Sequence, residues 1–78
     1  MTPQERMQNI QFGQQFRHYK GRIYTFLYIA RHSETEEWLV VYQNTKGDIW
    51  VRPYDMFFET ITVNGQMIKR FCAIESKE

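Results

Sequence analysis

Short runs of apolar and aromatic residues, separated by turn-forming residues, cover most of this 78-residue chain. Runs rich in Ile, Val, Tyr, Phe and Thr favour β-strands. The pattern predicts strands over residues 16–19, 22–31, 37–43, 48–52, 60–63 and 66–74. Glycines punctuate the turns between them, and the Asn64-Gly65 pair is the strongest hairpin signal in the chain. A helical or 3₁₀ turn is predicted over residues 54–59.

The first residues predict a short helix. Thr2 suits the N-cap, Pro3 suits the first helical position, and Glu5 completes a capping box. We expect Gly13 to end this segment and residues 1–12 to be a polar leader or short helix. Residues 75–78 are charged and are predicted to form a loose tail. A chain of this length predicts a single domain.

These elements predict a mainly β protein with five or six antiparallel strands in a small, strongly bent sheet. Closure of residues 13–74 into an SH3-like barrel would remove the exposed edges of so small a sheet. The alternative is an open sheet with the N-terminal helix packed on one face. In both cases a single turn of 3₁₀ or α-helix precedes the last hairpin.

A three-residue loop near Gly47 would place Gln43 opposite Ile49 and Tyr42 opposite Trp50. The strands then have one aliphatic and one aromatic face. The aliphatic face collects Ile23, Leu27, Ile29, Leu39, Val41, Ile49 and Val51, and the aromatic face collects Tyr24, Phe26, Tyr28, Trp38, Val40, Tyr42, Trp50 and Arg52. We predict that the aliphatic face forms the core and that the aromatic face is available to a ligand. A change of one residue in the loop would exchange the faces of the fourth strand.

Composition excludes several classes of protein. Hydrophobic residues make up 42% of the chain and aromatic residues 17%, which is unlike a disordered segment. The apolar runs fall far short of the roughly 18 residues that cross a bilayer, and the first residues have no apolar signal core. We therefore expect a cytoplasmic protein that does not engage a membrane. The single Cys72 offers no internal disulfide, and we predict that it is a small buried hydrophobe. No cofactor or metal is expected.

The net charge of +1 argues against a strong overall field for nucleic acid, but the charges are unevenly distributed. Residues 17–31 contain four basic residues and no acid, namely Arg17, Lys20, Arg22 and Arg31. Residues 32–59 contain six acids, namely Glu34, Glu36, Glu37, Asp48, Asp55 and Glu59, against Lys46 and Arg52. Pairing across neighbouring strands and a basic binding patch both fit this distribution.

Two histidine-containing segments carry candidate chemistry. In the segment FRHYKG, His18 could act as an acid or base and Lys20 could hold an anion beside Tyr19. The alternative is a hairpin corner at which His18 packs or accepts local hydrogen bonds. In RHSETE, His32 and Glu34 flank a serine, but adjacency in one loop does not make a catalytic triad. A polar loop with local backbone bonds fits that segment better, and a metal site would require the two histidines to converge.

The segment WVRPYDMF offers the best candidate for binding. Trp50 and Arg52 share a face, and Pro53 restricts the backbone after Arg52, which suits the capture of a carboxylate or phosphate. Trp50 offers a stacking plane for a base or a cation. Equally, Arg52 could pair with an acid such as Asp55 or Glu59. Asp55 is expected to cap the following turn.

The segments FRHYKGRIY, ARHSETEEWLVVYQ and GDIWVRPYDMFFE, together with the late Arg70-Phe71 pair, resemble a family of small bacterial proteins known as domain of unknown function 1653. The resemblance covers about residues 13–74. It implies a bacterial, cytoplasmic, compact domain, and it brings no established activity, substrate or catalytic residue.

The leading functional prediction is a non-enzymatic binding module. Its ligand would be a nucleotide, a nucleic-acid element or a peptide held by Trp50 and Arg52. Further contacts would come from loop residues, namely His18, Tyr19, Lys20, His32 and Glu34. One alternative is a small hydrolase or transferase that uses His18 or His32 with Arg52. Another is an interaction protein that forms a homodimer through the aromatic face.

Overall fold

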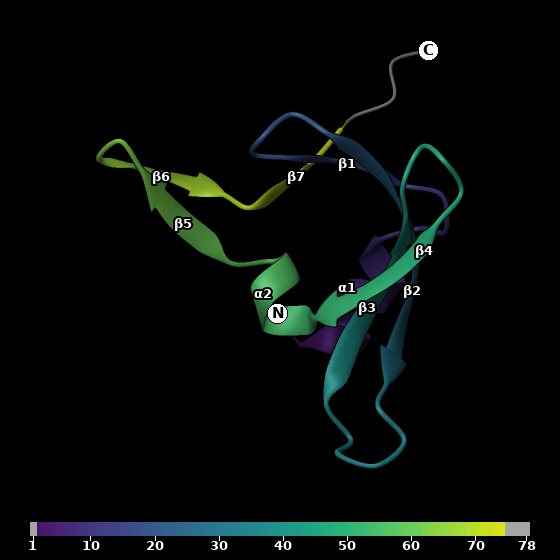
Figure 1. The fold of residues 1–78 in the computed structure, drawn as a ribbon. Coiled ribbons are helices and arrows are strands. Elements are labelled where there is room, and N and C mark those ends of the chain that lie inside the picture. The colour runs from purple at the N-terminus through teal and green to yellow at the C-terminus, as the bar shows by residue number, and fades with distance from the viewer. Residues whose placement is uncertain (1, 75–78) are drawn as a thin grey trace.

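A computed structural model gives the fold of the protein and describes residues 2–74 (Figure 1). Five antiparallel strands form the larger sheet in the order β4-β3-β2-β1-β7, and two more form a separate hairpin. The larger sheet comprises β1 (Gln15–His18), β2 (Ile23–Arg31), β3 (Trp38–Gln43), β4 (Ile49–Pro53) and β7 (Phe71–Ala73). The hairpin comprises β5 (Thr60–Val63) and β6 (Gln66–Lys69), and the helices are α1 (Pro3–Asn9) and α2 (Tyr54–Phe57). The prediction of a mainly β fold is confirmed.

Within residues 2–74 the larger sheet is open, because β4 and β7 form its two edges and do not pair. The closed SH3-like barrel therefore does not form, and the alternative of an open sheet is the one observed. β7 has only three residues, and β4 ends at Pro53, which lacks an N–H group. Neither edge thus offers the long ladder that closure would need. The β5–β6 hairpin projects away from the sheet (Figure 1).

Helix α1 begins as predicted, with a complete capping box. The hydroxyl of Thr2 accepts a hydrogen bond from the Glu5 N–H at 3.2 Å, and the Glu5 carboxylate accepts one from the Thr2 N–H at 3.3 Å. The helix ends at Asn9, because Ile10 already has an extended backbone. It therefore stops before Gly13, earlier than predicted.

The last predicted strand, residues 66–74, is two strands separated by a bend at Arg70. The N–H of Arg70 donates to the carbonyl of Glu59 at the base of the hairpin, and its carbonyl accepts from the N–H of Tyr19. β6 therefore stays with β5, whereas β7 joins β1 in the larger sheet. This division raises the strand number above the five or six predicted. The turn at Asn64 and Gly65 has positive φ at both residues, as a tight hairpin requires.

The register of β3 and β4 is the predicted one, with Tyr42 opposite Trp50 and Gln43 opposite Ile49. However, the core lies on the aromatic face, so the assignment of the aliphatic face to the core was wrong. Val40 and Tyr42 are buried, whereas Ile49 and Val51 are exposed. The aromatic rings of a short chain bury more area than its aliphatic side chains, which favours this choice of face.

A β-bulge at Leu27 changes the two faces of β2. Phe26 pairs with Tyr42 and Tyr28 pairs with Val41, which leaves Leu27 without a direct partner. The extra residue reverses the alternation, so that Phe26 and Ile29 both face the core while Tyr28 turns outward. We call the side of the sheet that carries Phe26, Val40 and Tyr42 the inner face.

The core is a cluster of aromatic rings on the inner face. Its buried members are Phe16, Phe26, Ile29, Val40, Tyr42, Tyr54, Phe57 and Phe71. Phe57, on the single turn of α2, is fully buried and stacks on Phe71 with ring centroids 4.1 Å apart.

Two sequence predictions about residues near this core are wrong. α2 has no side-chain cap, so Asp55 does not cap it, and Cys72 is exposed because Phe71, its neighbour on β7, takes the inward position.

Candidate functional site

The corner between β1 and β2 holds His18 in a defined orientation. Gly21 has φ of +106°, and its N–H donates to the His18 carbonyl at 2.7 Å, which closes the turn. The N–H of Lys20 donates to Nδ1 of His18 at 3.2 Å. The imidazole also packs edge-on against Phe71, with ring centroids 4.9 Å apart. The predicted packing and local hydrogen bonding of His18 are therefore both present.

Arg52 lies on the inner face of β4, opposite Val40. Its Nε donates to the hydroxyl of Tyr42 at 3.4 Å, and its guanidinium carbon lies 5.5 Å from the ring centroid of Phe71. Among residues 2–74, no carboxylate forms an ion pair with Arg52, so the predicted pairing with Asp55 or Glu59 does not occur. Aromatic groups thus position a guanidinium whose charge no described carboxylate neutralises.

Arg70 approaches the same place from the bend between β6 and β7. Its guanidinium forms an ion pair with Glu59, and its Nε donates to Glu59 Oε1 at 2.7 Å. Arg70 therefore carries its own counter-charge and fixes the base of the hairpin. His18 and Arg52 both contact the ring of Phe71, and the charges of Arg70 and Lys20 also act on His18. We call His18, Lys20, Arg52 and Arg70 the His18–Arg52 cluster.

The electrostatics of the cluster act on His18. Burial lowers the pKa of the His18 imidazole below its ordinary value, and the charges of Arg52, Arg70 and Lys20 lower it further, in that order. The folded protein therefore favours the neutral imidazole. Because Nδ1 accepts the Lys20 N–H, the proton of the neutral ring lies on Nε2, so the ring acts as a donor there.

Trp50 and Tyr19 are aromatic neighbours of members of this cluster. Trp50 lies two residues before Arg52 on the same face of β4, and 53% of its surface is exposed. Tyr19 packs against the His18 ring at 4.6 Å, and the Lys20 ammonium lies 5.7 Å from the Tyr19 ring centroid. Among residues 2–74, no carboxylate pairs with Lys20 either. The two motifs FRHYKG and WVRPYDMF are thus brought together.

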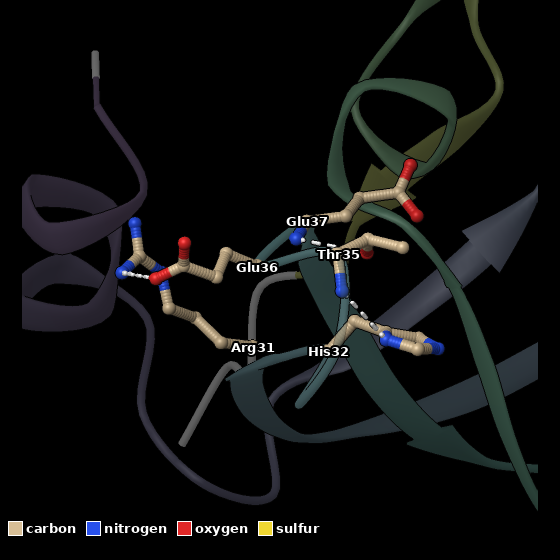
Figure 2. Close-up of polar contacts among 5 residues, drawn as sticks. All are labelled: Arg31, His32, Thr35, Glu36 and Glu37. Carbon is tan, nitrogen blue, oxygen red and sulfur yellow. Dashed lines mark hydrogen bonds and ion pairs between the residues drawn. The ribbon is translucent and has the colours of Figure 1, made fainter.

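His32 and Glu34 lie elsewhere, in the loop between β2 and β3. Figure 2 shows the side chain of His32 in this loop. The whole length of β2 separates this loop from the corner that holds His18. Nδ1 of His32 accepts hydrogen bonds from the N–H groups of Glu34 at 3.1 Å and Thr35 at 3.3 Å. These two hydrogen bonds stabilise the conformation of the loop. Arg31 pairs with Glu36 across the same loop at 3.8 Å. The structure therefore does not bring His32 and Glu34 to His18, and their hydrogen bonds stay within their own loop.

Sequence reasoning missed three members of the arrangement around Arg52. Arg70 lies inside the predicted strand 66–74, and the sequence suggests Glu59 only as a partner of Arg52. The predicted aromatic face includes Tyr42, but the sequence indicates no role for Tyr42 in holding Arg52. The Lys69-Arg70 pair, two adjacent cations before Phe71, breaks the alternation of that segment and could have signalled the bend.

Neither a metal-binding cluster nor a membrane-spanning helix is present in the described part of the chain. No group of three or more His, Cys, Asp or Glu side chains lies close enough to hold a metal ion. No helix there has the length and apolar character needed to cross a membrane.

Residues 14–73 match the family described as protein of unknown function, DUF1653. The crystal structure of a protein belonging to DUF1653 from Bordetella bronchiseptica superposes with a TM-score of 0.75 at 31% sequence identity. That match covers 92% of this chain and 99% of the other. The comparison with curated proteins finds no match. On the family match and the fold together, the chain is a member of the DUF1653 family.

Proposed function

We propose that the protein is a binding module that holds a phosphate group at the His18–Arg52 cluster. The observation that carries this proposal is Arg52, which Tyr42 and Phe71 position while no described carboxylate neutralises it. A guanidinium in such a setting donates two parallel hydrogen bonds to a phosphate or carboxylate. The neutral His18 adds an Nε2–H donor, and Lys20 adds a mobile ammonium group.

Trp50 supports a nucleotide or single-stranded nucleic acid as the phosphate-bearing ligand. Its ring is half-exposed on the same face as Arg52, two residues along the strand. Stacking of one base on an aromatic ring contributes about 1–3 kcal/mol and tolerates every base. The combination of one stacking plane with two or three cations suits a mononucleotide or a short stretch of single strand, in keeping with the small net charge of +1.

The same geometry argues against a histidine base. A general base needs an unprotonated ring nitrogen that faces the substrate. In both His18 and His32, Nδ1 already accepts backbone N–H groups, which assigns the proton of the neutral ring to Nε2. Glu59, at the base of the β5–β6 hairpin, is engaged by Arg70. We therefore favour binding over catalysis for this cluster.

The direct test is calorimetric titration with adenosine monophosphate, inorganic phosphate and a short oligothymidylate. We expect Arg52→Gln to weaken binding of each probe at least about tenfold, since a hydrogen bond to a charged group contributes about 1.5–3 kcal/mol. The matched control is Arg17→Gln, which removes the same charge from an exposed residue of β1 next to His18 in sequence. This control should retain affinity within about twofold.

Two outcomes would contradict the proposal. If Arg17→Gln and Arg52→Gln weaken binding equally, only the net charge matters and there is no site. If acidic peptides bind through Arg52 while none of the phosphate probes does, the ligand is a carboxylate and the phosphate proposal is wrong. Circular dichroism of each variant confirms that a loss of binding is not a loss of fold.

A further inference from the structure

The edge strand β4 presents apolar side chains on both of its faces. Ile49 is 61% exposed, Trp50 53% and Val51 59%. In the described part of the chain, β3 is the single strand that pairs with β4. Natural sheets usually protect such an edge with charges, bulges or prolines. In β4 the protecting residues lie only at the two ends of the strand, with Asp48 before the apolar triplet and Arg52-Pro53 after it. The central residues 49–51 carry no charge, bulge or proline.

The pairing with β3 fixes which backbone groups of β4 point outward. The N–H of Asn44 donates to the carbonyl of Asp48, so the carbonyl of Asp48 faces β3. Antiparallel residues alternate between hydrogen-bonded and non-hydrogen-bonded pairs. The backbone N–H and carbonyl groups of Trp50 and Arg52 therefore also point toward β3. The N–H and carbonyl groups of Ile49 and Val51 therefore point to the open edge. Pro53 also faces outward, where its missing N–H ends any further ladder.

We propose that a second copy of this chain pairs with this edge, with the two β4 strands antiparallel and related by a twofold axis at Trp50. In this register Ile49 of each copy lies opposite Val51 of the other. The four outward backbone groups of each copy, the N–H and carbonyl groups of Ile49 and Val51, then find partners in two hydrogen-bonded pairs. A register centred on Val51 would set Ile49 opposite Pro53, which cannot donate, so the Trp50 register satisfies more groups.

The charges at the two ends fit the same register. Asp48 of one copy lies opposite Arg52 of the other, and the twofold axis repeats this complementary pair at the other end. Opposite charges directly across a ladder stabilise it, and like charges destabilise it. Exposed apolar residues meet in the centre while charges of opposite sign meet at the ends. One strand thus carries a self-complementary pattern of hydrogen bonds, apolar side chains and charges.

This assembly does not depend on the proposed phosphate site, but the two share Arg52. The twofold axis runs perpendicular to the sheet, so the inner faces of both copies lie on one side of a continuous sheet of ten strands, five from each copy. Asp48 of the second copy and a bound phosphate would compete for Arg52. The oligomeric state is therefore measured in low-salt buffer without phosphate.

The first test removes one outward N–H group. Sedimentation velocity over about 10 µM to about 1 mM suits the small interface that one strand provides. The wild-type chain should pass from monomer to dimer in this range, and Val51→Pro should weaken the dimer at least about tenfold. Val51 makes no ladder bond to β3, so the proline leaves the fold intact. The matched control, Val51→Thr, retains the N–H group and a branched side chain and should still dimerise.

The second test reads the register directly. In a homodimer, Asp48→Arg sets two arginines opposite each other at both ends of the paired strands, and Arg52→Asp sets two aspartates there. Each variant alone should therefore be monomeric. An equimolar mixture of the two variants should dimerise again, because a dimer of unlike copies sets an arginine opposite an aspartate at both ends.

A second rescue is the double variant that carries both Asp48→Arg and Arg52→Asp in one chain. Its two ends again set an arginine opposite an aspartate, with the charges exchanged, so this variant should recover the dimer that each single variant loses. A wild-type chain that stays monomeric to about 1 mM would overturn the proposal. So would a Val51→Pro variant that dimerises like wild type, or a folded double variant that dimerises no better than the two single variants.

Discussion

The guanidinium carbon of Arg52 lies 5.5 Å from the ring centroid of Phe71, so a side chain from one edge of the open sheet rests on a ring from the other edge. β4 and β7 share no ladder in the described chain, and contacts of this kind bring them together instead. A guanidinium over an aromatic face contributes about 0.5–2 kcal/mol. The contact therefore positions the charge of Arg52 at the same time as it helps to hold the fold.

Replacement of Arg52 should change the titration of His18. Arg52 is the largest charge contribution to the lowered pKa of His18, after burial. We expect Arg52→Gln to raise the pKa of His18 toward its ordinary value, measured from the ring proton shifts by NMR. Arg17→Gln is again the control and should leave that pKa nearly unchanged. An equal rise in both variants would show that Arg52 has no special proximity to His18.

The lowered pKa of His18 also predicts how stability depends on pH. Because the folded state prefers the neutral ring, its contribution to stability is complete above the unfolded pKa of about 6.5 and is lost as pH falls toward the lower folded value. His18→Asn should remove this part of the slope, measured by urea unfolding between about pH 7.5 and 5. A slope that is unchanged by the substitution would contradict the assignment.

Phosphate binding should show the opposite dependence on pH. A bound anion favours the protonated imidazole, so binding raises the pKa of His18 and becomes tighter as pH falls through its titration range. Calorimetric titration of the wild-type chain with phosphate at several pH values measures this effect. The affinity of the His18→Asn variant for phosphate should change with pH only as far as the ionisation of phosphate itself requires.

Phe57 should be the most sensitive residue of the core. It is fully buried, stacks on Phe71 at 4.1 Å and meets Phe16 edge-on at 5.3 Å. We expect Phe57→Ala to lower the free energy of unfolding by about 3–5 kcal/mol. The neighbouring exposed Met56 is the control, and Met56→Ala should cost less than about 1 kcal/mol. If Phe57→Ala fails to fold, Phe57→Leu gives the milder loss, still larger than that of the control.

His32 should affect the local loop and leave the ligand site intact. His32→Ala removes the acceptor for two backbone N–H groups at an exposed position and should cost about 0.5–1.5 kcal/mol of stability. His32→Asn should recover part of this loss, because an Asn side chain accepts the N–H group two residues on. Affinity for the phosphate probes should not change in either variant. A clear loss of affinity in either variant would show that His32 takes part in binding the phosphate probes.

Local signals in the sequence predicted local structure well. Thr2, Pro3 and Glu5 form the helix start, and the turn at Gly47 sets Tyr42 opposite Trp50. The features that were missed depend on tertiary contacts. The bulge at Leu27 has no distinctive local signature, yet it reverses the faces of β2. The choice of the aromatic face as the core depends on the rings of Phe57 and Phe71, which other parts of the chain supply.

The candidate site divides in the same way. Trp50 and Arg52 could be paired from their spacing on one strand, and Lys20 could be placed beside His18 at one turn. The ion pair between Glu59 and Arg70 joins the two sides of a hairpin base, and nothing in either residue's neighbours indicates it. That pair matters because it leaves Arg52 as the guanidinium of the cluster without a counter-charge among the described residues.

The most direct test of the phosphate site is an NMR titration of the wild-type chain with adenosine monophosphate. We expect the largest shifts on the side chains of His18, Arg52 and Trp50, and we expect the pKa of His18 to rise in the complex. We expect no shift at His32, at the far end of β2. Saturable shifts centred on His32 and Glu34, or no shift at Arg52 at millimolar ligand, would contradict the account.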